Sequence, residues 1–334
     1  MTALRTTFYS YKGGVGRTLA LLNVGAWLAA NGRKVVAVDL DLEAPGFGLS
    51  SLTRRPSQET LGVSDLLRDR YNGGTRSFEE YYYHLPASQV GTAADNFFLL
   101  PVGTDPLWLS RILPELYQDP NSDRAELFLL LLDEIEAALN PDFILIDSRT
   151  GRADIAGVAM LELPQVIVTI CGLNEQNVEG MQRVLTDLRQ HPAHRADVLT
   201  LLALSPVPSE NVLLPHRGDA SPVPALLDTG SSAKAIIDPR VLLKRRIDEI
   251  KAQLFVEIQR EFDQSVQKRF PELDQTDLFH QLPYDPLVPL TDELQISRPG
   301  DLGRSYGKLA NVIARARTGD PGLPQFKPRV GPRL

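Results

Sequence analysis

Three glycines, two cations and a threonine are gathered between positions 12 and 18, in a segment that reads KGGVGRT. Glycine allows the backbone to curl so that successive N–H groups point inward, and the start of a following helix adds partial positive charge at the same place. A short apolar segment precedes the glycines, and a helix-like stretch, residues 19–30, follows them. The segment therefore predicts a phosphate-binding loop that suits a triphosphate.

This loop departs from the general P-loop pattern G-x-x-x-x-G-K-[ST] at two positions. Tyr11 stands where the first glycine belongs and Arg17 where the lysine belongs, whereas Gly16 and Thr18 match the pattern. Lys12 is an additional cation that the general pattern does not require. The alternative is a glycine-rich turn that binds nothing. It is disfavoured because strand, loop and helix follow one another in the required order and two acidic motifs come later.

Each acidic motif ends an apolar segment. Residues 35–38 are apolar and lead into Asp39 and Asp41, and residues 143–146 are apolar and lead into Asp147. Such segments indicate buried parallel strands, and ligands of doubly wound sheets bind where these strands end. A single aspartate at a strand end is more often a turn former. Two carboxylates opposite a phosphate loop instead favour a nucleotide and metal site.

With Lys12 before the paired glycines, the loop resembles the deviant Walker A loop, K-G-G-x-G-K-[ST], of ParA- and MinD-like ATPases. The resemblance implies that the chain binds Mg-ATP and forms an ATP-dependent homodimer in which Lys12 reaches the partner's nucleotide. It also implies that Arg17 holds the β- and γ-phosphates and that Asp41 positions the attacking water, so these three side chains are the expected catalytic residues. The expected nucleotide contacts also include Gly13, Gly14, Val15, Gly16, Thr18 and Leu19, and the expected magnesium shell involves Thr18, Asp39 and Asp147.

Two further segments extend the resemblance. The residues after Asp147 read SRTG, which matches a variant subgroup of the family that also carries arginine in its loop. Arginine is always charged but bulkier than lysine, so nucleotide binding is expected to be retained and hydrolysis to be slow. Pro283 and Tyr284 resemble a MinD-like segment that lies beside the adenine base; the alternative is an ordinary proline-flanked turn with a packed tyrosine.

Strand-like segments alternate with helical stretches along the chain. The expected strands lie at about residues 5–10, 34–39, 97–102, 143–147, 166–171, 198–204 and 279–282. This alternation predicts an α/β fold with a doubly wound, mainly parallel sheet covered by helices on both faces. The resemblance places this fold among P-loop NTPases of the SIMIBI type. One domain, residues 1–318, is expected, followed by a proline-rich basic tail at 319–334.

Three segments of that domain fall outside the resemblance. Residues 50–95 contain turn formers and three consecutive tyrosines, which indicate an insertion of the kind that often selects partners. Residues 206–240 are proline-rich and indicate a surface excursion. Residues 241–270 have apolar side chains every three or four positions and predict one long helix. Packing against the core is the first interpretation of that helix, and a partner-docking or dimer-edge surface is the second.

Composition excludes several classes of protein. The 334 residues carry a net charge of −7, so the general positive field that favours nonspecific DNA binding is absent, although a local basic face could still bind DNA. Cys171 is the only cysteine, which excludes an intrachain disulfide and the paired cysteines of a bridging iron–sulfur cluster. No apolar stretch approaches the ~20 residues of a spanning helix, so a cytoplasmic protein without a membrane segment is expected.

The predicted function is that of a slowly hydrolysing ATPase that dimerises with ATP and acts as a switch on a protein partner or activator of unknown identity. One alternative is a nucleotide-dependent interaction module of a bacterial signalling or defence assembly, with little hydrolysis. The departures at Tyr11 and Arg17 motivate it. A bacterial tyrosine kinase, which shares this loop, is a further alternative. It is disfavoured because its C-terminal tyrosine cluster is missing, Tyr306 being the last tyrosine of the chain.

Overall fold

An eight-stranded sheet runs through the computed structural model, which describes residues 2–42, 44–47, 53, 61–85, 95–109, 111–112, 126–148, 163–190, 197–208, 238–286, 288, 294–297, 300–318, 320 and 322. The strands are β1 (Leu4–Tyr9), β2 (Val35–Asp39), β3 (Tyr83–His84), β4 (Phe97–Leu100), β5 (Phe143–Asp147), β6 (Val166–Cys171), β7 (Leu199–Val207) and β8 (Phe279–Pro283). Their order in the sheet is β3-β4-β2-β5-β1-β6-β7-β8, and only β3 is antiparallel to its neighbour. The predicted α/β fold with a mainly parallel sheet is confirmed, as are all seven predicted strands.

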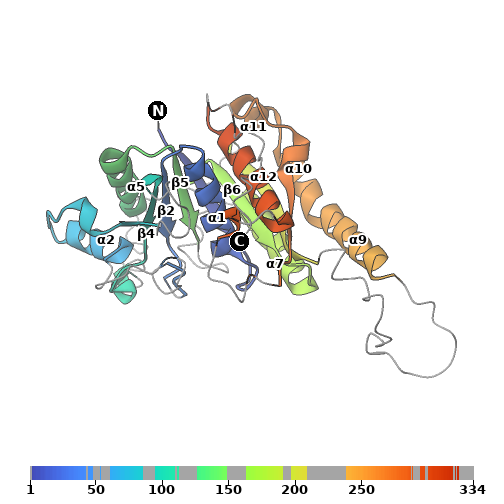
Figure 1. Ribbon diagram of the computed structural model, residues 1–334, viewed down its shortest axis with the longest axis horizontal. Coiled ribbons are helices and arrows are strands. Elements are labelled where there is room, and N and C mark those ends of the chain that lie inside the picture. Colours follow the sequence, from blue (N-terminus) through green and yellow to red (C-terminus); the bar gives the residue numbers. More distant parts are fainter. Residues whose placement is uncertain are drawn as a thin grey trace, which may run out of the picture.

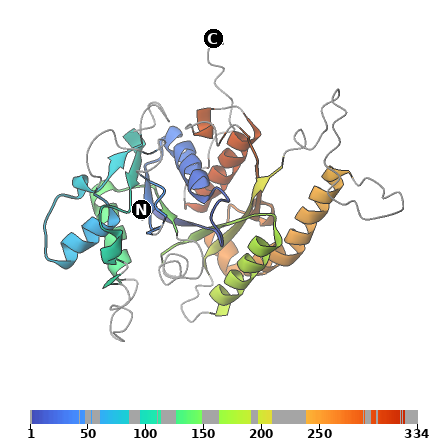
Figure 2. The same ribbon diagram turned by 90° about the horizontal axis from the view of Figure 1, so that it is seen from below.

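Helices cover both faces of this sheet (Figures 1 and 2). The longer ones are α1 (Arg17–Ala30), α2 (Val63–Tyr71), α5 (Glu126–Leu139), α7 (Glu175–Gln190), α9 (Pro239–Ile250) and α12 (Asp301–Ala316). Helices α1 and α12 lie together on one face, and α5 and α7 lie on the other. Alternate side chains of each central strand enter the two layers, because successive residues of a strand point to opposite faces. Val35 and Ala37 of β2 pack with the α1 layer, whereas Val36 and Val38 pack with α2 and α5.

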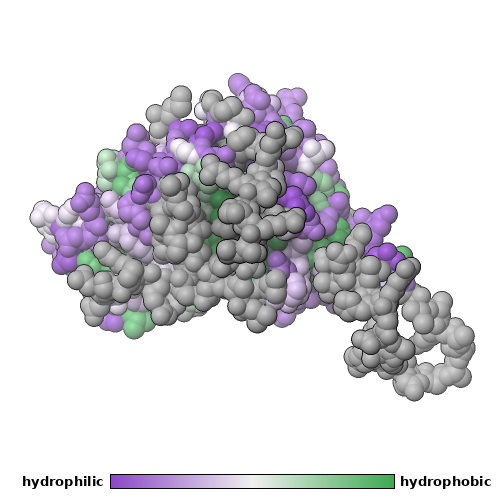
Figure 3. Space-filling view, in the orientation of Figure 1, coloured by the Kyte–Doolittle hydropathy of each residue, from purple (hydrophilic) through white to green (hydrophobic). Residues whose placement is uncertain are grey.

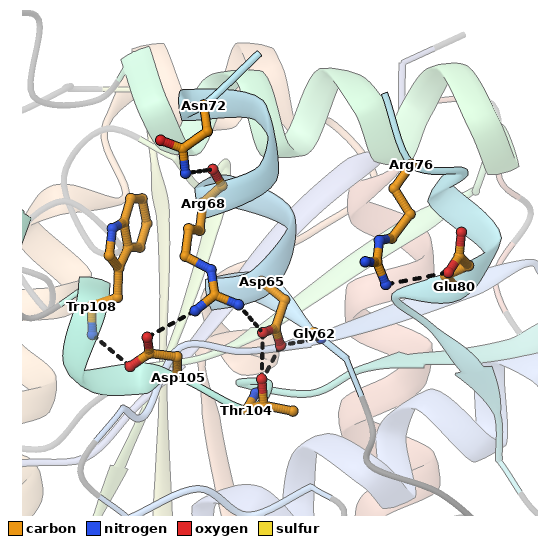
Figure 4. Close-up of polar contacts among 9 residues, drawn as sticks. All are labelled: Gly62, Asp65, Arg68, Asn72, Arg76, Glu80, Thr104, Asp105 and Trp108. Carbon is orange, nitrogen blue, oxygen red and sulfur yellow. Dashed lines mark hydrogen bonds and ion pairs between the residues drawn. The ribbon is translucent and has the colours of Figure 1, made fainter. Parts of the chain in front are cut away.

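The region at residues 50–95 contains regular structure that the sequence pattern did not predict. Helix α2 and the short strand β3 lie within it, and a polar network attaches the start of α2 to the loop that follows β4 (Figure 4). The carboxylate of Asp65 accepts hydrogen bonds from the Gly62 N–H (3.1 Å), the Thr104 N–H (2.7 Å) and the Thr104 hydroxyl (2.5 Å). Arg68 adds ion pairs to Asp65 (3.2 Å) and Asp105 (2.9 Å). These contacts fasten this part of the expected insertion to the sheet.

The prediction of one long helix over residues 241–270 is wrong. Helix α9 continues through a π-helical turn, η3 (Lys251–Phe255), into α10 (Val256–Glu261), and the chain then breaks before α11 (Gln264–Arg269). The break occurs because Asp263 caps α11 by accepting hydrogen bonds from the N–H groups of Ser265 and Val266. The apolar periodicity nevertheless marks core positions, since Ile250, Leu254 and the later apolar residues of the run are buried.

Two other predicted segments lie largely outside the described residues. The structure describes residues 206–208 and 238–240 of the proline-rich excursion, and only residues 320 and 322 of the tail. On the face of the molecule in Figure 3 the described surface is mainly hydrophilic, and hydrophobic side chains form small separate areas. Among the described residues, no helix has both the length and the apolar character needed to cross a membrane.

Candidate functional site

The predicted acidic residues meet at the carboxyl ends of three adjacent strands. Register pairs Asp39 at the end of β2 with Asp147 at the end of β5, and Phe8 of β1 lies on the other side of Asp147. Both carboxylates are fully buried. The loop between β1 and α1, residues 10–16, leaves the sheet at the same edge. Because parallel strands bring their carboxyl ends to one edge, residues more than a hundred positions apart form a single cluster.

The glycines of this loop have the conformations that the phosphate-binding prediction requires. Gly14 and Gly16 have φ angles of +80° and +82°, in the left-handed region that favours glycine. A Cβ at Gly13 or Gly14 would meet nothing within 4 Å, so the space above both backbones is open. Gly16 directly precedes α1, whose first N–H groups point toward the loop. The loop can therefore present backbone donors and a helix N-terminus to an anion.

Contacts from β7 and α7 hold the loop in place, and sequence patterns did not indicate them. The Ser205 hydroxyl donates a hydrogen bond of 2.8 Å to the Val15 carbonyl. Tyr11 packs so closely on Gly180 of α7 that a Cβ at Gly180 would overlap the tyrosine ring. Tyr11, which replaces the first glycine of the general pattern, is thus accommodated by a glycine elsewhere. A pattern that considers only neighbours in sequence has no signal for such a pair.

Arg17 lies between two carboxylates. Its Nη2 is 2.7 Å from Asp41, and its Nε donates a short hydrogen bond to Asp147. The arginine side chain is 7% exposed, and its Nη1 has no hydrogen-bond partner among the described residues. Burial alone would lower the pKa of Arg17, but Asp147 and Asp41 raise it above its ordinary value. Arg17 is therefore a buried, permanently charged bridge between the two acidic motifs, with one donor free for an acceptor.

Thr18 and Asp39 contact other parts of the same cluster. The Thr18 hydroxyl donates to Asp147 at 2.5 Å. Asp39 accepts hydrogen bonds from the backbone N–H groups of Asp41 (3.0 Å), Gly46 (2.8 Å) and Phe47 (2.9 Å). Asp39 thus acts as a turn former for the segment after β2, which is the alternative interpretation of a strand-end aspartate. The predicted role of Asp39 in a magnesium shell stays a prediction.

Gly46 brings the segment after β2 against the phosphate loop. A Cβ at Gly46 would come within 2.6 Å of the Thr18 methyl group, so only glycine permits this approach. Gly46 was not among the predicted site residues. Its contact connects the loop to the segment that carries Asp41, the predicted water-positioning residue.

The two buried carboxylates at the strand ends have raised pKa values. Burial, followed by the charge of Asp147, raises the pKa of Asp39 to about 8. Burial also raises the pKa of Asp147, although Arg17 and the Thr18 hydroxyl act in the opposite direction. Asp39 and Asp147 are adjacent, and of the two only Asp147 pairs with Arg17 among the described residues. Both would gain from a further cation, because an opposite charge favours the ionised form. The cluster therefore suits a metal ion electrostatically.

The residues present fit a magnesium-bound nucleotide better than an all-protein metal site. Among the described residues, no three His, Cys, Asp or Glu side chains come together as a ligand set. Mg²⁺ is usually held by one or two protein oxygens together with substrate phosphates and waters. The Thr18 hydroxyl and the Asp147 carboxylate, beside a loop whose Gly13 and Gly14 face open space, are suitable for that arrangement.

The remaining predicted residues lie farther from this cluster. Lys12 is half-buried beside the exposed Gly13 and Gly14, and it forms no ion pair with any described residue. Pro283 ends β8, three strand positions from β1, or roughly 14 Å at ~4.8 Å per strand. Tyr284 is 40% exposed and donates its N–H to the Val207 carbonyl at 2.6 Å. No described contact joins Pro283 or Tyr284 to the loop, so their contact with a base stays a prediction.

The comparisons with known proteins agree with the geometry of the loop and strand ends. A family profile described as an AAA domain (AAA_31) matches residues 5–199, which is more than half of the chain. The chain belongs to this family of ParA/MinD-like P-loop ATPases. The chromosome-partitioning ATPase Soj of Treponema pallidum (strain Nichols) is 32% identical over 143 residues. That match covers 42% of this chain and 46% of the relative, so the chain spans about half of the relative's length.

Solved structures of the same fold cover nearly the whole chain. McdA from Cyanothece, in a complex with ATP, has a TM-score of 0.58 at 14% identity, over 93% of this chain and 96% of its own. The septum site-determining protein MinD of Pyrococcus horikoshii, complexed with Mg-ADP, has a TM-score of 0.55 at 19% identity, over 94% and 96% of the two chains. These likenesses confirm the fold of the ParA/MinD-like family beyond the region that the family profile matches.

Proposed function

We propose that the protein binds Mg-ATP at the loop of residues 12–18, hydrolyses it slowly, and uses the bound nucleotide as a switch for dimerisation. The observation that carries this proposal is the position of Arg17, whose side chain is held by Asp41 and Asp147 at the end of a loop whose Gly13 and Gly14 face open space. The solved MinD and McdA relatives carry Mg-ADP and ATP, which supports the choice of an adenine nucleotide.

Arg17 connects nucleotide binding to a change in the acidic segment. Its free Nη1 and the fork geometry of the guanidinium suit phosphate oxygens. When Arg17 turns toward the phosphates, Asp41 and Asp147 lose their shared cation. When bound, the magnesium ion supplies positive charge at the strand ends and polarises the phosphate groups. Asp41 is then free to accept a hydrogen bond from a water at the end of the triphosphate, which is the role of a positioning base.

This exchange of partners accounts for slow turnover. The Asp41–Arg17 and Asp147–Arg17 pairs are buried, and separating a buried ion pair is costly unless each charge finds a new partner. A lysine at position 17 would carry one point charge and could not bridge both carboxylates with separate nitrogens. We therefore expect Arg17 to favour nucleotide binding with a stable resting state over fast hydrolysis.

Lys12 supports the dimeric form of the switch. It is a cation beside the exposed apex of the loop, with no described anionic partner in its own chain. Two nucleotides that face each other across a dimer bring several negative charges together, and each Lys12 would offset part of that repulsion from the opposite subunit. An ordinary phosphate loop has no task for a cation at this position.

Light scattering of the Asp41→Ala protein tests this proposal, because that variant should retain ATP and not hydrolyse it. We expect ATP, and not ADP, to convert the monomer to a dimer. Adding Lys12→Gln should reverse the conversion while leaving nucleotide binding by the monomer largely intact. A protein that stays monomeric with every nucleotide, or Lys12 variants that dimerise as readily as the parent, would contradict the dimerisation switch.

The buried Arg17 bridge also favours a second candidate, a nucleotide-dependent interaction module with little hydrolysis. A phosphate-release assay with and without magnesium separates the two, since the module should bind ATP without magnesium-dependent turnover. Burial of two tyrosines in the internal cluster, residues 81–83, argues against the tyrosine kinase alternative. Tyr81 and Tyr83 are 1% and 7% exposed, so neither hydroxyl is accessible to another subunit's nucleotide in this fold.

A further inference from the structure

A groove lies along the sheet edge formed by β8, three strand positions from β1, the strand that carries the phosphate loop. The groove has a volume of about 990 Å³ and runs between α9 and the first half of α12, with β8 as its floor. In Figures 1 and 2, α9 and α12 stand apart on either side of β8. Of the residues predicted above to contact the nucleotide, only Pro283, at the end of β8, lines this groove.

The groove exposes the outer edge of β8 and not merely one of its faces. Phe279, His280 and Gln281 all line it, although neighbouring residues of a strand point to opposite faces. The Phe279 ring contacts Phe255 and Lys251 on the α9 side, whereas His280 lies near Lys308 on the α12 side. A hollow that reaches both faces of one strand must pass along its edge.

That edge is unpaired within the described part of the chain. β8 is the last strand of the sheet, and its described strand neighbour is β7. In contrast to the fully buried strands β5 and β6, β8 is only partly buried, and Gln281 is exposed. A sheet edge of this kind presents a row of backbone donors and acceptors to which another extended segment can add.

Lysines line both walls of the groove. Lys244 and Lys251 lie on the α9 side and Lys308 on α12. None of the three forms an ion pair with a described residue. Two arginines also line the groove but pair with neighbouring aspartates, Arg240 with Asp238 and Arg304 with Asp301. In total the lining has five cations against two carboxylates, in a chain whose net charge is −7.

His280 does not change this balance near neutral pH. Burial lowers the pKa of His280 to about 4, and its Nε2 lies 2.9 Å from the Asp277 carbonyl. The charge of the groove at pH 7 therefore comes from its lysines. The lysines stand on opposite sides of the edge. Side chains of an added strand alternate between these two sides, so a carboxylate pointing to either side would meet a lysine.

We propose that this groove docks an extended, carboxylate-bearing peptide segment of a partner protein, which adds to the outer edge of β8 as a ninth strand. The edge supplies backbone hydrogen bonds, the lysines supply charge complementarity on both walls, and the Phe279 ring supplies an apolar contact. A peptide fits these features better than a nucleic acid, because a phosphate backbone would use the lysines and leave the strand edge unpaired.

Selection from a displayed library of random twelve-residue peptides tests the proposal, with the full-length protein as bait. Parallel selections use Lys244→Glu/Lys308→Glu as the variant and Lys268→Glu, which changes an exposed lysine of α11 outside the groove, as the matched control. We expect the parent and the control to enrich peptides with Asp or Glu at alternate positions. We expect the Kd of such peptides to rise at least tenfold for the double variant.

Chemical synthesis of one enriched peptide separates strand addition from charge attraction. N-methylation of alternate backbone nitrogens leaves the carboxylates in place but removes the donors that pair with β8. Two methylated peptides are compared, one with methyl groups on the odd-numbered backbone nitrogens and one with them on the even-numbered nitrogens. The parent protein should lose binding to the peptide whose methylated nitrogens face β8 and keep binding to the other. This arm uses only the parent protein, so it stands even if the double variant does not fold.

Three outcomes would overturn the proposal. Selection could enrich no peptide that distinguishes the parent from the double variant. The lysines would then serve only to protect the sheet edge from aggregation. Both methylated peptides could bind as well as the unmodified one. A duplex or single-stranded oligonucleotide could bind in a lysine-dependent way while no peptide does, which would identify a nucleic-acid surface.

Discussion

Arginine at position 17 gives the phosphate loop a resting state of its own. One guanidinium contacts Asp41 and Asp147 through two different nitrogens, and its third nitrogen has no partner in the part of the chain that the structure describes. A point charge could satisfy only one of these carboxylates well. The substitution that looks like a defect against the general pattern is therefore a specific link between the loop and both acidic motifs.

Removing that link should destabilise the folded protein as well as weaken nucleotide binding. Arg17→Ala leaves two buried carboxylates without their cation, and breaking a buried pair in this way costs about 3–5 kcal/mol. Urea unfolding at pH 7 should show this loss, and Arg17→Lys should show a smaller one. The loss should shrink as the pH is lowered below 7, because burial raises the pKa of Asp147 and favours its protonation. An Arg17→Ala protein as stable as the parent at pH 7 would mean that the bridge is not formed in solution.

Thr18 should matter only when magnesium is present. Its hydroxyl is the group beside Asp147 that can ligate the metal, so Thr18→Ala should lower ATP affinity about tenfold or more in magnesium and little in EDTA. Titration calorimetry under both conditions measures the difference. Thr186→Ala is the matched control, since that hydroxyl donates to the Gln182 carbonyl within the exposed part of α7. Equal loss with and without magnesium would show that Thr18 acts on the fold and not on the metal.

At the scale of elements, helix α7 and strand β7 determine where the loop lies. α7 presents Gly180 to Tyr11, and β7 presents Ser205 to Val15. Neither contact is part of the nucleotide motif, and each joins residues more than 160 positions apart in the sequence. The loop is thus positioned by packing as well as by its own glycines.

The Tyr11–Gly180 contact predicts that a change at Tyr11 compensates for a change at Gly180. Gly180→Ala adds a methyl group where the tyrosine ring lies, and overpacking of this kind costs about 1–3 kcal/mol. We expect weaker ATP binding and a lower unfolding temperature, because the ring must push the loop away from α7. Tyr11→Ala alone should be milder, and the double variant should recover most of the lost affinity. Additive losses in the double variant would show that the two residues act separately.

The packing of α7 against α10 predicts a pH dependence. Arg189 of α7 pairs with both Glu257 (2.5 Å) and Glu261 (3.3 Å). Burial raises the pKa of Glu261 from 4.5 to about 7; Arg189 opposes this shift and Glu257 adds to it. The folded chain therefore binds this proton more tightly than the unfolded chain. Stability from this group should fall as the pH rises from about 4.5 to about 7 and stay level above 7.

Glu261→Gln should remove that part of the pH dependence. The variant should gain on the order of 1–2 kcal/mol relative to the parent between pH 5 and pH 8. Urea unfolding at several pH values measures this gain, and Glu249→Gln, on α9, serves as the control. A parent and variant with parallel stability curves would mean that Glu261 is ionised throughout this range.

At the scale of the whole molecule, the candidate site joins four strands of one sheet. β1 carries the loop, β2 and β5 end in its carboxylates, and β7 holds the loop through Ser205. A ligand that contacts all of them should stabilise the entire fold. Mg-ATP at a hundred times its Kd should add about 2.7 kcal/mol to the free energy of unfolding, and the unfolding temperature should rise with ligand concentration. AMP, which lacks the β- and γ-phosphates, should have little effect; an equal effect would locate the binding energy elsewhere.

Local order along the chain was enough to predict the α/β fold and the loop and strand-end aspartates that meet in the candidate site. Apolar segments that end in Asp39 and Asp147, and glycines between a strand and a helix, are signals between near neighbours. Parallel pairing then brings those strand ends to one edge. The break at Asp263 left such a local signal too, an N-cap aspartate within the apolar run, but the periodicity outweighed it.

Tertiary structure alone decided how these residues interact. The pairing of Arg17 with both carboxylates, the fit of Tyr11 on Gly180 and the approach of Gly46 to Thr18 depend on distances between segments that are remote in sequence. The open edge of β8 between lysines of α9 and α12 has no local sequence signal either. Composition and periodicity report which face of an element is buried. Which side chain meets which is set by the packing of elements, and that packing depends on the whole chain at once.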